Sequence, residues 1–322
     1  MKIVIATILM INSVFLFGQE LETDTTWIES EAKSLFSEAD ELTSIVYYHL
    51  ELDYLIENLD TLTEKGKIKK EVYLEQKEDL LRRALFNYEQ MTSKYPTSSL
   101  YHKALNNRGI IEFEFKMYER AKKSFLEILN SDVDGKEEVR VGFGLMAEPY
   151  ANYRNRAAEM LYEIEFAQGN YEEAKKILEE STKYKYYHWC GNAHEEKEFW
   201  LAYQRSKIES KLGNFEEARK LMIPHLFSQR IMKDQELAQY CLNLLFHIYT
   251  KEELIDEFKT GINNYYSRKI RPDSDYLDYF INFLGEELEV DIYMPENRDE
   301  EPNMIRDKVE NQWIYYLIKS EN

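Results

Sequence analysis

A six-residue block that recurs three times constrains this chain more than any other feature. Its clearest copies are GNYEEA at 169–174 and GNFEEA at 213–218, and a looser copy is KMYERA at 116–121. Glycine ends a helix in the left-handed conformation without a Cβ penalty. The aromatic side chain fills the gap between two helices, and the alanine three residues later lets them approach closely. Each block therefore predicts a tight turn between two antiparallel helices.

This arrangement of small, aromatic and small residues resembles the tetratricopeptide repeat (TPR), a helical hairpin that recurs about every 34 residues. The aromatics lie at positions 118, 171 and 215, so their intervals are 53 and 44 residues. We therefore expect inserted, irregular loops at 131–150 and 182–196. The alternative is three unrelated amphipathic hairpins that share a turn. The positions expected to pack within the hairpins are Gly109, Tyr118, Ala121, Phe125, Gly169, Tyr171, Ala174, Leu178, Gly213, Phe215, Ala218 and Met222.

Apolar residues recur at spacings of three and four along most of the chain, and only 11 Gly and 6 Pro occur in 322 residues. This pattern predicts an all-α protein, an α-solenoid of stacked antiparallel helical hairpins that is TPR-like. The expected parts are a signal peptide (1–18), a long N-terminal helical hairpin (19–99), TPR-like repeats with inserted loops (100–230), degenerate helical repeats (231–284), an acidic linker (285–302) and a C-terminal helix (303–322).

Several local expectations follow from the same pattern. Gly66 is expected to mark the turn of the long hairpin, and Thr250 to Glu253 has the spacing of a capping box. A helix is expected at about 274–284 and a short strand at 290–293. The C-terminal helix carries an apolar stripe, which we expect to dock on the preceding helices.

The first 20 residues have the layout of a secretory signal peptide. One lysine precedes an apolar run from Ile3 to Phe17, which is short for a membrane-spanning helix. We expect cleavage after Gly18, export to the periplasm or the medium, and no integral membrane span after cleavage. An uncleaved N-terminal anchor is the alternative. The loop at 182–196 is also similar to segments of TPR-like proteins from Bacteroidetes-type bacteria.

Composition argues against a nucleic-acid partner. The formal net charge is −19, and no basic stripe interrupts the acidic helical faces. Such a surface repels phosphate backbones. The 25 tyrosines suit half-buried positions between helices, and tyrosine is also favoured at recognition surfaces.

No motif identifies a reaction, so we expect a non-enzyme without a metal or cofactor. His188, Cys190 and His194 are zinc-ligating residue types, but their spacing matches no zinc pattern. An ordered loop between hairpins is the preferred interpretation. The stretch DVDG at 132–135 lacks the remaining positions of a calcium loop. A disulfide between Cys190 and Cys241 is left open.

The TPR resemblance implies a protein or peptide partner, because the first helix of each TPR hairpin lines a concave groove. An enzyme or ligand-binding protein acting on envelope glycan or peptide is the alternative, and an envelope assembly factor is a variant of the first hypothesis. Trp200 and Tyr203 could instead pack on the loop at 182–196. The groove residues implied by the resemblance are Lys103, Asn106, Ile110, Arg156, Glu159, Glu163, Trp200, Tyr203 and Lys207.

Overall fold

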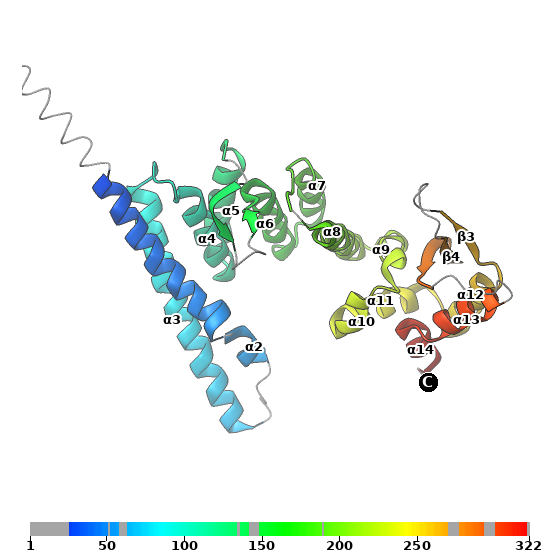
Figure 1. Ribbon diagram of the computed structural model, residues 1–322. Coiled ribbons are helices and arrows are strands. Elements are labelled where there is room, and N and C mark those ends of the chain that lie inside the picture. Colours follow the sequence, from blue (N-terminus) through cyan, green and yellow to red (C-terminus); the bar gives the residue numbers. More distant parts are fainter. Residues whose placement is uncertain are drawn as a thin grey trace, which may run out of the picture. The chain divides into compact units, whose positions relative to one another are not determined.

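The computed structural model describes residues 26–50, 52–57, 63–133, 136–141, 148–188, 190–269, 277–292 and 300–320. These residues are mostly helical, with two small antiparallel sheets (Figure 1). The chain divides into two compact units. The first contains the described residues up to Gln168 together with Glu179–Tyr187, and the second contains Gly169–Leu178 together with the chain from His188 onward. The expected signal peptide lies outside the described residues.

The first unit begins with the expected long hairpin. A helix over 26–44 continues as a π-helical turn, η1 (Ile45–His49), and then as α2 (Leu52–Glu57). The returning helix is α3 (Glu64–Lys94) (Figure 1). Phe36 packs on Tyr88 between the two arms. The Thr63 hydroxyl caps α3 by accepting a hydrogen bond from the Gly66 amide at 3.1 Å. The expected turn at Gly66 is therefore wrong, because this glycine belongs to the first turn of α3.

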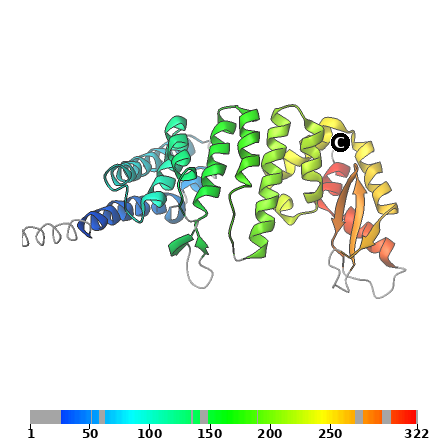
Figure 2. The same cartoon turned by 90° about the horizontal axis from the view of Figure 1, so that it is seen from above.

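Three further helices of the first unit lie side by side, namely α4 (Tyr101–Glu114), α5 (Tyr118–Leu129) and α6 (Tyr153–Ala167) (Figure 2). Gly109 lets α5 approach α4 closely, since a Cβ atom at this position would lie 2.7 Å from Cζ of Phe125. The segment between α5 and α6 was expected to be irregular. It instead forms an antiparallel pair, β1 (Lys136–Val141) and β2 (Glu148–Tyr150).

The three recurring blocks adopt one turn geometry. Gly169 and Gly213 have φ angles of 82° and 83°, and Lys116 occupies the same left-handed region with φ 57°. In the first and third blocks, the residue after the left-handed one donates its amide hydrogen to a carbonyl five residues earlier, at 2.8 Å. The alanines at 121, 174 and 218 are completely buried, in agreement with the alignment.

The second unit continues with helices up to residue 263. The Thr250 hydroxyl and the Glu253 carboxylate form the predicted capping box at the start of the last of them. The elements are α7 (Tyr171–Ser181), whose last residues belong to the first unit, α8 (Gly191–Lys211), α9 (Phe215–Met222), the 3-10 turn η3 (Ile223–His225), α10 (Gln229–Lys233), α11 (Gln235–Ile248) and α12 (Lys251–Asn263).

A three-stranded antiparallel sheet contains the described part of the segment expected to form a helix at 274–284, whose residues 274–276 lie outside the described residues. Its order is β3 (Tyr266–Arg268), β4 (Asp278–Phe283) and β5 (Glu286–Val290). Leu284 and Gly285 join β4 to β5 with φ angles of 53° and 86°, as a tight hairpin turn requires. Gly261 of α12 packs directly on β4, because a Cβ atom there would lie 2.5 Å from the Asn282 carbonyl oxygen.

The acidic linker and the single C-terminal helix also need correction. The linker segment 285–302 contains β5 and the start of α13 (Glu301–Glu310), and the strand expected at 290–293 ends at Val290. A second helix, α14 (Trp313–Ser320), follows after a break at residues 311 and 312. Both helices dock on the second unit, as expected. Ile305 and Ile314 are buried in its core, and the Trp313 indole donates a hydrogen bond to the Leu226 carbonyl at 2.7 Å.

The left-handed turn generates a stability prediction. A non-glycine residue in the left-handed conformation destabilises the folded chain by about 1–2 kcal/mol. Glycine avoids this strain, but it also increases the conformational entropy of the unfolded chain, which offsets part of the gain. We expect Lys116→Gly to raise the free energy of unfolding by up to about 1 kcal/mol, and Gly213→Ala to lower it by about 1 kcal/mol. A Cβ atom at Gly213 would meet open space, so the second effect is conformational and not steric. Urea unfolding of both variants checks this, and an unchanged Gly213→Ala variant would contradict it.

Candidate functional site

Three buried carboxylates are candidates for acid–base chemistry, because burial shifts the pKa of such groups. Glu112, Glu165 and Glu209 are each at most 5% exposed. Each lies six residues before the aromatic of its block and directly follows an isoleucine, so the three copies share an Ile-Glu pair that the sequence analysis overlooked. An ionised carboxylate taken out of water needs a cation or several hydrogen bonds. The partners of these glutamates therefore decide whether they are available for a reaction.

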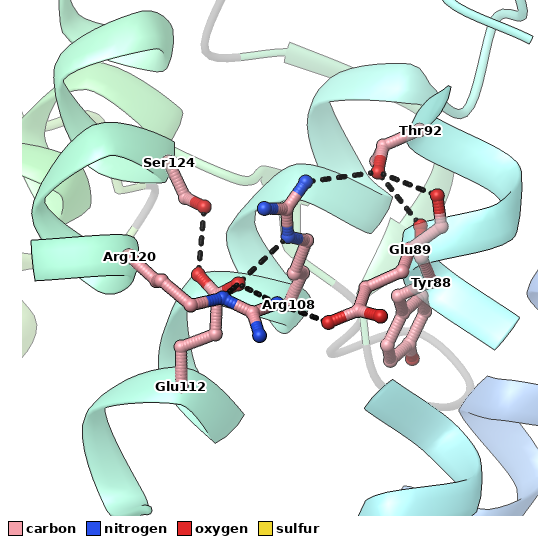
Figure 3. A network of polar contacts seen from close by, with 7 residues as sticks. All are labelled: Tyr88, Glu89, Thr92, Arg108, Glu112, Arg120 and Ser124. Carbon is pink, nitrogen blue, oxygen red and sulfur yellow. Dashed lines mark hydrogen bonds and ion pairs between the residues drawn. The ribbon is translucent and has the colours of Figure 1, made fainter. Parts of the chain in front are cut away.

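Glu112 lies at the centre of a network that joins α3, α4 and α5 (Figure 3). The guanidinium groups of Arg108 and Arg120 donate to its Oε1 at 2.9 Å, and the Ser124 hydroxyl donates to Oε2 at 2.9 Å. The Arg120 guanidinium also pairs with Glu89 of α3, and that of Arg108 donates to the Thr92 hydroxyl of α3 at 3.2 Å. Both carboxylate oxygens are thus engaged in helix packing.

The second and third glutamates share a different partner. The ammonium group of Lys122 on α5 pairs with Glu165 on α6. The Lys175 ammonium on α7 pairs with Glu209 on α8 at 2.7 Å, and the Asn214 amide donates to the same carboxylate at 2.8 Å. Each lysine lies four residues after the aromatic of one block, and each glutamate six residues before the next aromatic. One ion pair therefore recurs between the second helix of one hairpin and the first helix of the next.

The last hairpin carries the same cation but uses it differently. Arg219 lies four residues after Phe215 and is almost fully buried. Its guanidinium donates to the Leu284 carbonyl at 3.1 Å and pairs with Glu216 at 2.8 Å. Leu284 belongs to the turn between β4 and β5. The recurring cation of the third block thus holds the turn between β4 and β5.

Glu209 shows how the partners act on a carboxylate. Burial raises its pKa, but hydrogen bonds from Lys175 and Asn214 and the charge of Lys175 lower it by more, so the net pKa lies below the ordinary value. The group is therefore ionised at neutral pH. A carboxylate held in this way is a structural anion and a poor general acid.

The residues implied for the TPR groove meet several environments in the first unit. The Lys103 ammonium lies 5.4 Å from the centre of the Phe36 ring, so the first helix covers this side chain. Asn106 is buried, which corrects its assignment to an open groove, and its Oδ1 accepts no hydrogen bond from the described residues. Ile110, Glu159 and Glu163 are half-buried, and Arg156 is exposed.

The groove residues of the third hairpin are half-buried. Tyr203 packs edge-on against Tyr240 of α11, with ring centres 5.4 Å apart. This ring contact is with α11, whereas the alternative expectation was a contact with the loop at 182–196. The Lys207 ammonium lies 5.3 Å from the Tyr203 ring centre, and the Lys197 ammonium lies 4.6 Å from the Trp200 ring. The helices α4 and α6 belong to the first unit and α8 belongs to the second, so the residues of each are described only within their own unit.

The loop after α7 is held by two buried asparagines. Asn152 has φ 53°, and its side-chain amide pairs with the Tyr187 backbone through two hydrogen bonds of 2.9 Å. Asn155 donates to the Tyr184 carbonyl at 3.2 Å. The Asn152 side chain is hydrogen-bonded to the Tyr187 backbone, and it makes no capping hydrogen bond to the first turn of α6.

A hollow of about 360 Å³ lies between the loop and the first turn of α6. Three cationic side chains line it, and its remaining lining residues are neutral. The Arg154 guanidinium lies 5.0 Å from the Tyr184 ring centre, and the Lys185 ammonium lies 5.0 Å from the Tyr187 ring centre. The residues of the hollow are Val133, Asn152, Arg154, Asn155, Lys183, Tyr184, Lys185 and Tyr187. In the sequence, the histidines and the cysteine of the loop stand out, whereas these cations belong to no motif.

The residues of zinc-ligating type at 188, 190 and 194 make hydrogen bonds with one another. The Cys190 amide donates to Nδ1 of His188 at 3.0 Å, and the His194 ring meets the His188 carbonyl at 3.3 Å. No group of three or more metal-ligand side chains occurs among the described residues. Cys190 and Cys241 are both free, so the disulfide left open by the sequence does not form in this structure. Burial raises the pKa of the Cys241 thiol to about 12.

No family model matches the chain, and no curated protein matches it. Within the described ranges, no helix is both long enough and apolar enough to cross a membrane. The TPR resemblance therefore rests on the recurring blocks and on their shared geometry.

The lowered pKa of Glu209 predicts a change in stability with pH. In the unfolded chain Glu209 binds a proton at its ordinary pKa of 4.5, and in the folded chain it binds one only at a lower pH. The contribution of its charge to the free energy of unfolding is therefore complete above pH 4.5 and is lost as the pH falls below that value. We expect Glu209→Gln to lower the free energy of unfolding by about 1–3 kcal/mol near neutral pH and by less near pH 3. Urea unfolding at several pH values measures the difference.

The control is Glu173→Gln, which removes a carboxylate from the exposed pair with Lys176. This variant should change stability little at any pH. An equal loss for Glu209→Gln at both ends of the pH range would contradict the structural role of its charge.

Proposed function

We propose that this protein is an exported, non-catalytic, TPR-like scaffold that binds a protein or peptide partner in the cell envelope. The observation that carries the proposal is the ion pair that recurs from Lys122 to Glu165 and from Lys175 to Glu209. A contact repeated at equivalent positions of successive hairpins is typical of a repeat protein, in which each unit packs only on its neighbours. Repeat proteins present extended faces of equivalent helices to their partners.

The first helices of the hairpins are the proposed binding faces. On α6, Arg156 is exposed, and Glu159 and Glu163 lie on the same stripe at spacings of three and four. On α8, Trp200 and Lys207 are partly exposed. Aromatic side chains and arginines are the residues that contribute most often to protein interfaces. A partner that carries both positive and negative side chains fits such a surface better than a purely apolar partner.

The buried glutamates argue against the enzyme alternative. Each is held by cations between helices, and an enzyme that cleaves glycans needs two carboxylates facing one substrate.

Export is tested by the fate of the first 18 residues. We expect the protein in the periplasm or the medium of the bacterium that produces it, with an N-terminus at Gln19. Cell fractionation followed by N-terminal sequencing measures both. A full-length chain that stays in the cytoplasm would refute the proposed location.

Partner binding is tested with the mature protein as bait in envelope extracts, followed by rebinding of the purified partner. We expect Arg156→Glu to weaken rebinding by at least about tenfold, because a charge reversal in an interface creates a repulsion. Lys176→Glu on α7 is the matched control, since this lysine is exposed and lies on a second helix. If both variants bind the partner as tightly as the wild type, the α6 face is not the binding surface.

A further inference from the structure

The hollow between the loop at 183–187 and the first turn of α6 carries a local charge opposite to that of the whole protein. The formal net charge of the chain is −19, but the described residues that line the hollow include three cations and no carboxylate. Lys183 has a distant exposed partner, Glu180, at 3.7 Å. No carboxylate among the described residues lies within ion-pair distance of Arg154 or Lys185. Two cations therefore face one hollow without an internal counter-charge.

Both cations are positioned by aromatic rings instead of carboxylates. Arg154 lies over Tyr184 and Lys185 over Tyr187, at 5.0 Å from each ring centre. These rings belong to a loop that Asn152 and Asn155 fasten to α6 through three hydrogen bonds. A cation on an aromatic face keeps its N–H groups free for a further acceptor. The N–H groups of Arg154 and Lys185 are therefore held at the hollow as hydrogen-bond donors.

The first turn of α6 adds a second source of positive potential. The N-terminus of a helix carries unpaired amide hydrogens and the positive end of the helix dipole. The Asn152 side chain bonds to the loop and does not cap the helix, and Asn152, Arg154 and Asn155 of this turn line the hollow. Arginine, lysine and backbone amides together form the donor set that recognises carboxylate or phosphate oxygens.

We propose that this hollow binds an oxyanion, the carboxylate or phosphate group of a ligand. At about 360 Å³ it accommodates the anionic end of a ligand and one neighbouring group, with the tyrosine rings in contact with the apolar part. The site lies apart from the α6 stripe that begins at Arg156, because Arg156 does not line the hollow. The inference therefore does not rest on the proposed partner-binding face.

The test measures binding of three probes to the mature protein by calorimetry at constant ionic strength. The probes are inorganic phosphate, succinate and a short peptide supplied with either a free or an amidated C-terminus. We expect the double variant Arg154→Gln/Lys185→Gln to bind the preferred probe at least about tenfold more weakly than the wild type. The single variant Arg154→Lys, which keeps the charge but loses the planar fork, should give an intermediate affinity.

The matched control is Arg83→Gln/Lys123→Gln, which removes the same charge from exposed positions of the first unit outside the hollow. This control should bind like the wild type, and thermal melts should show all variants folded. Preference for the free peptide over the amide would identify the end of a polypeptide as the source, and preference for phosphate would identify a phosphorylated ligand. Failure of every probe to bind, or equal weakening in the control, would overturn the proposal.

Discussion

A carboxylate buried between helices must be paired, and this requirement organises the helical hairpins. Removing one partner of such a pair costs about 1–3 kcal/mol, although the pair itself adds little over an apolar contact. The pairs of Glu165 with Lys122 and of Glu209 with Lys175 therefore act mainly on specificity. A hairpin that packed in a different register would leave a glutamate without its cation. Glu112 meets the same requirement with two arginines, so the first copy uses other residues for the same purpose.

The turn between the helices could be predicted because glycine marks it in two copies. Lys116 adopts the same left-handed conformation without being glycine, and only the alignment of the neighbouring residues revealed it. The sheet was missed for a related reason. Apolar residues at 279–283 were assigned to a helix, although the run is short, aromatic and ends at Gly285. Leucine at 284, where asparagine is usual, concealed the hairpin turn.

The candidate site was less predictable than the fold. The Ile-Glu pairs at 111, 164 and 208 were visible at constant spacing, but a recurring acidic residue normally indicates a solvated helix face. Only the structure shows these glutamates buried. The cations of the hollow come from α6 and from a loop about 30 positions later, so no local motif joins them. Their meeting depends on Asn152 and Asn155, whose role in fastening the loop has no sequence signature.

The arginine at 219 has a consequence for how such a chain can grow. Repeat proteins lengthen by duplication of a hairpin, and a new copy needs a free cation on the helix before it to pair with its own buried glutamate. After the third hairpin that cation is already bound to the turn of the sheet. A duplicated hairpin inserted between existing copies would find a matching partner on both sides. If the hairpins form the repeat array that we propose, a copy added after the third would need a new cation, whereas a copy inserted between existing ones would not.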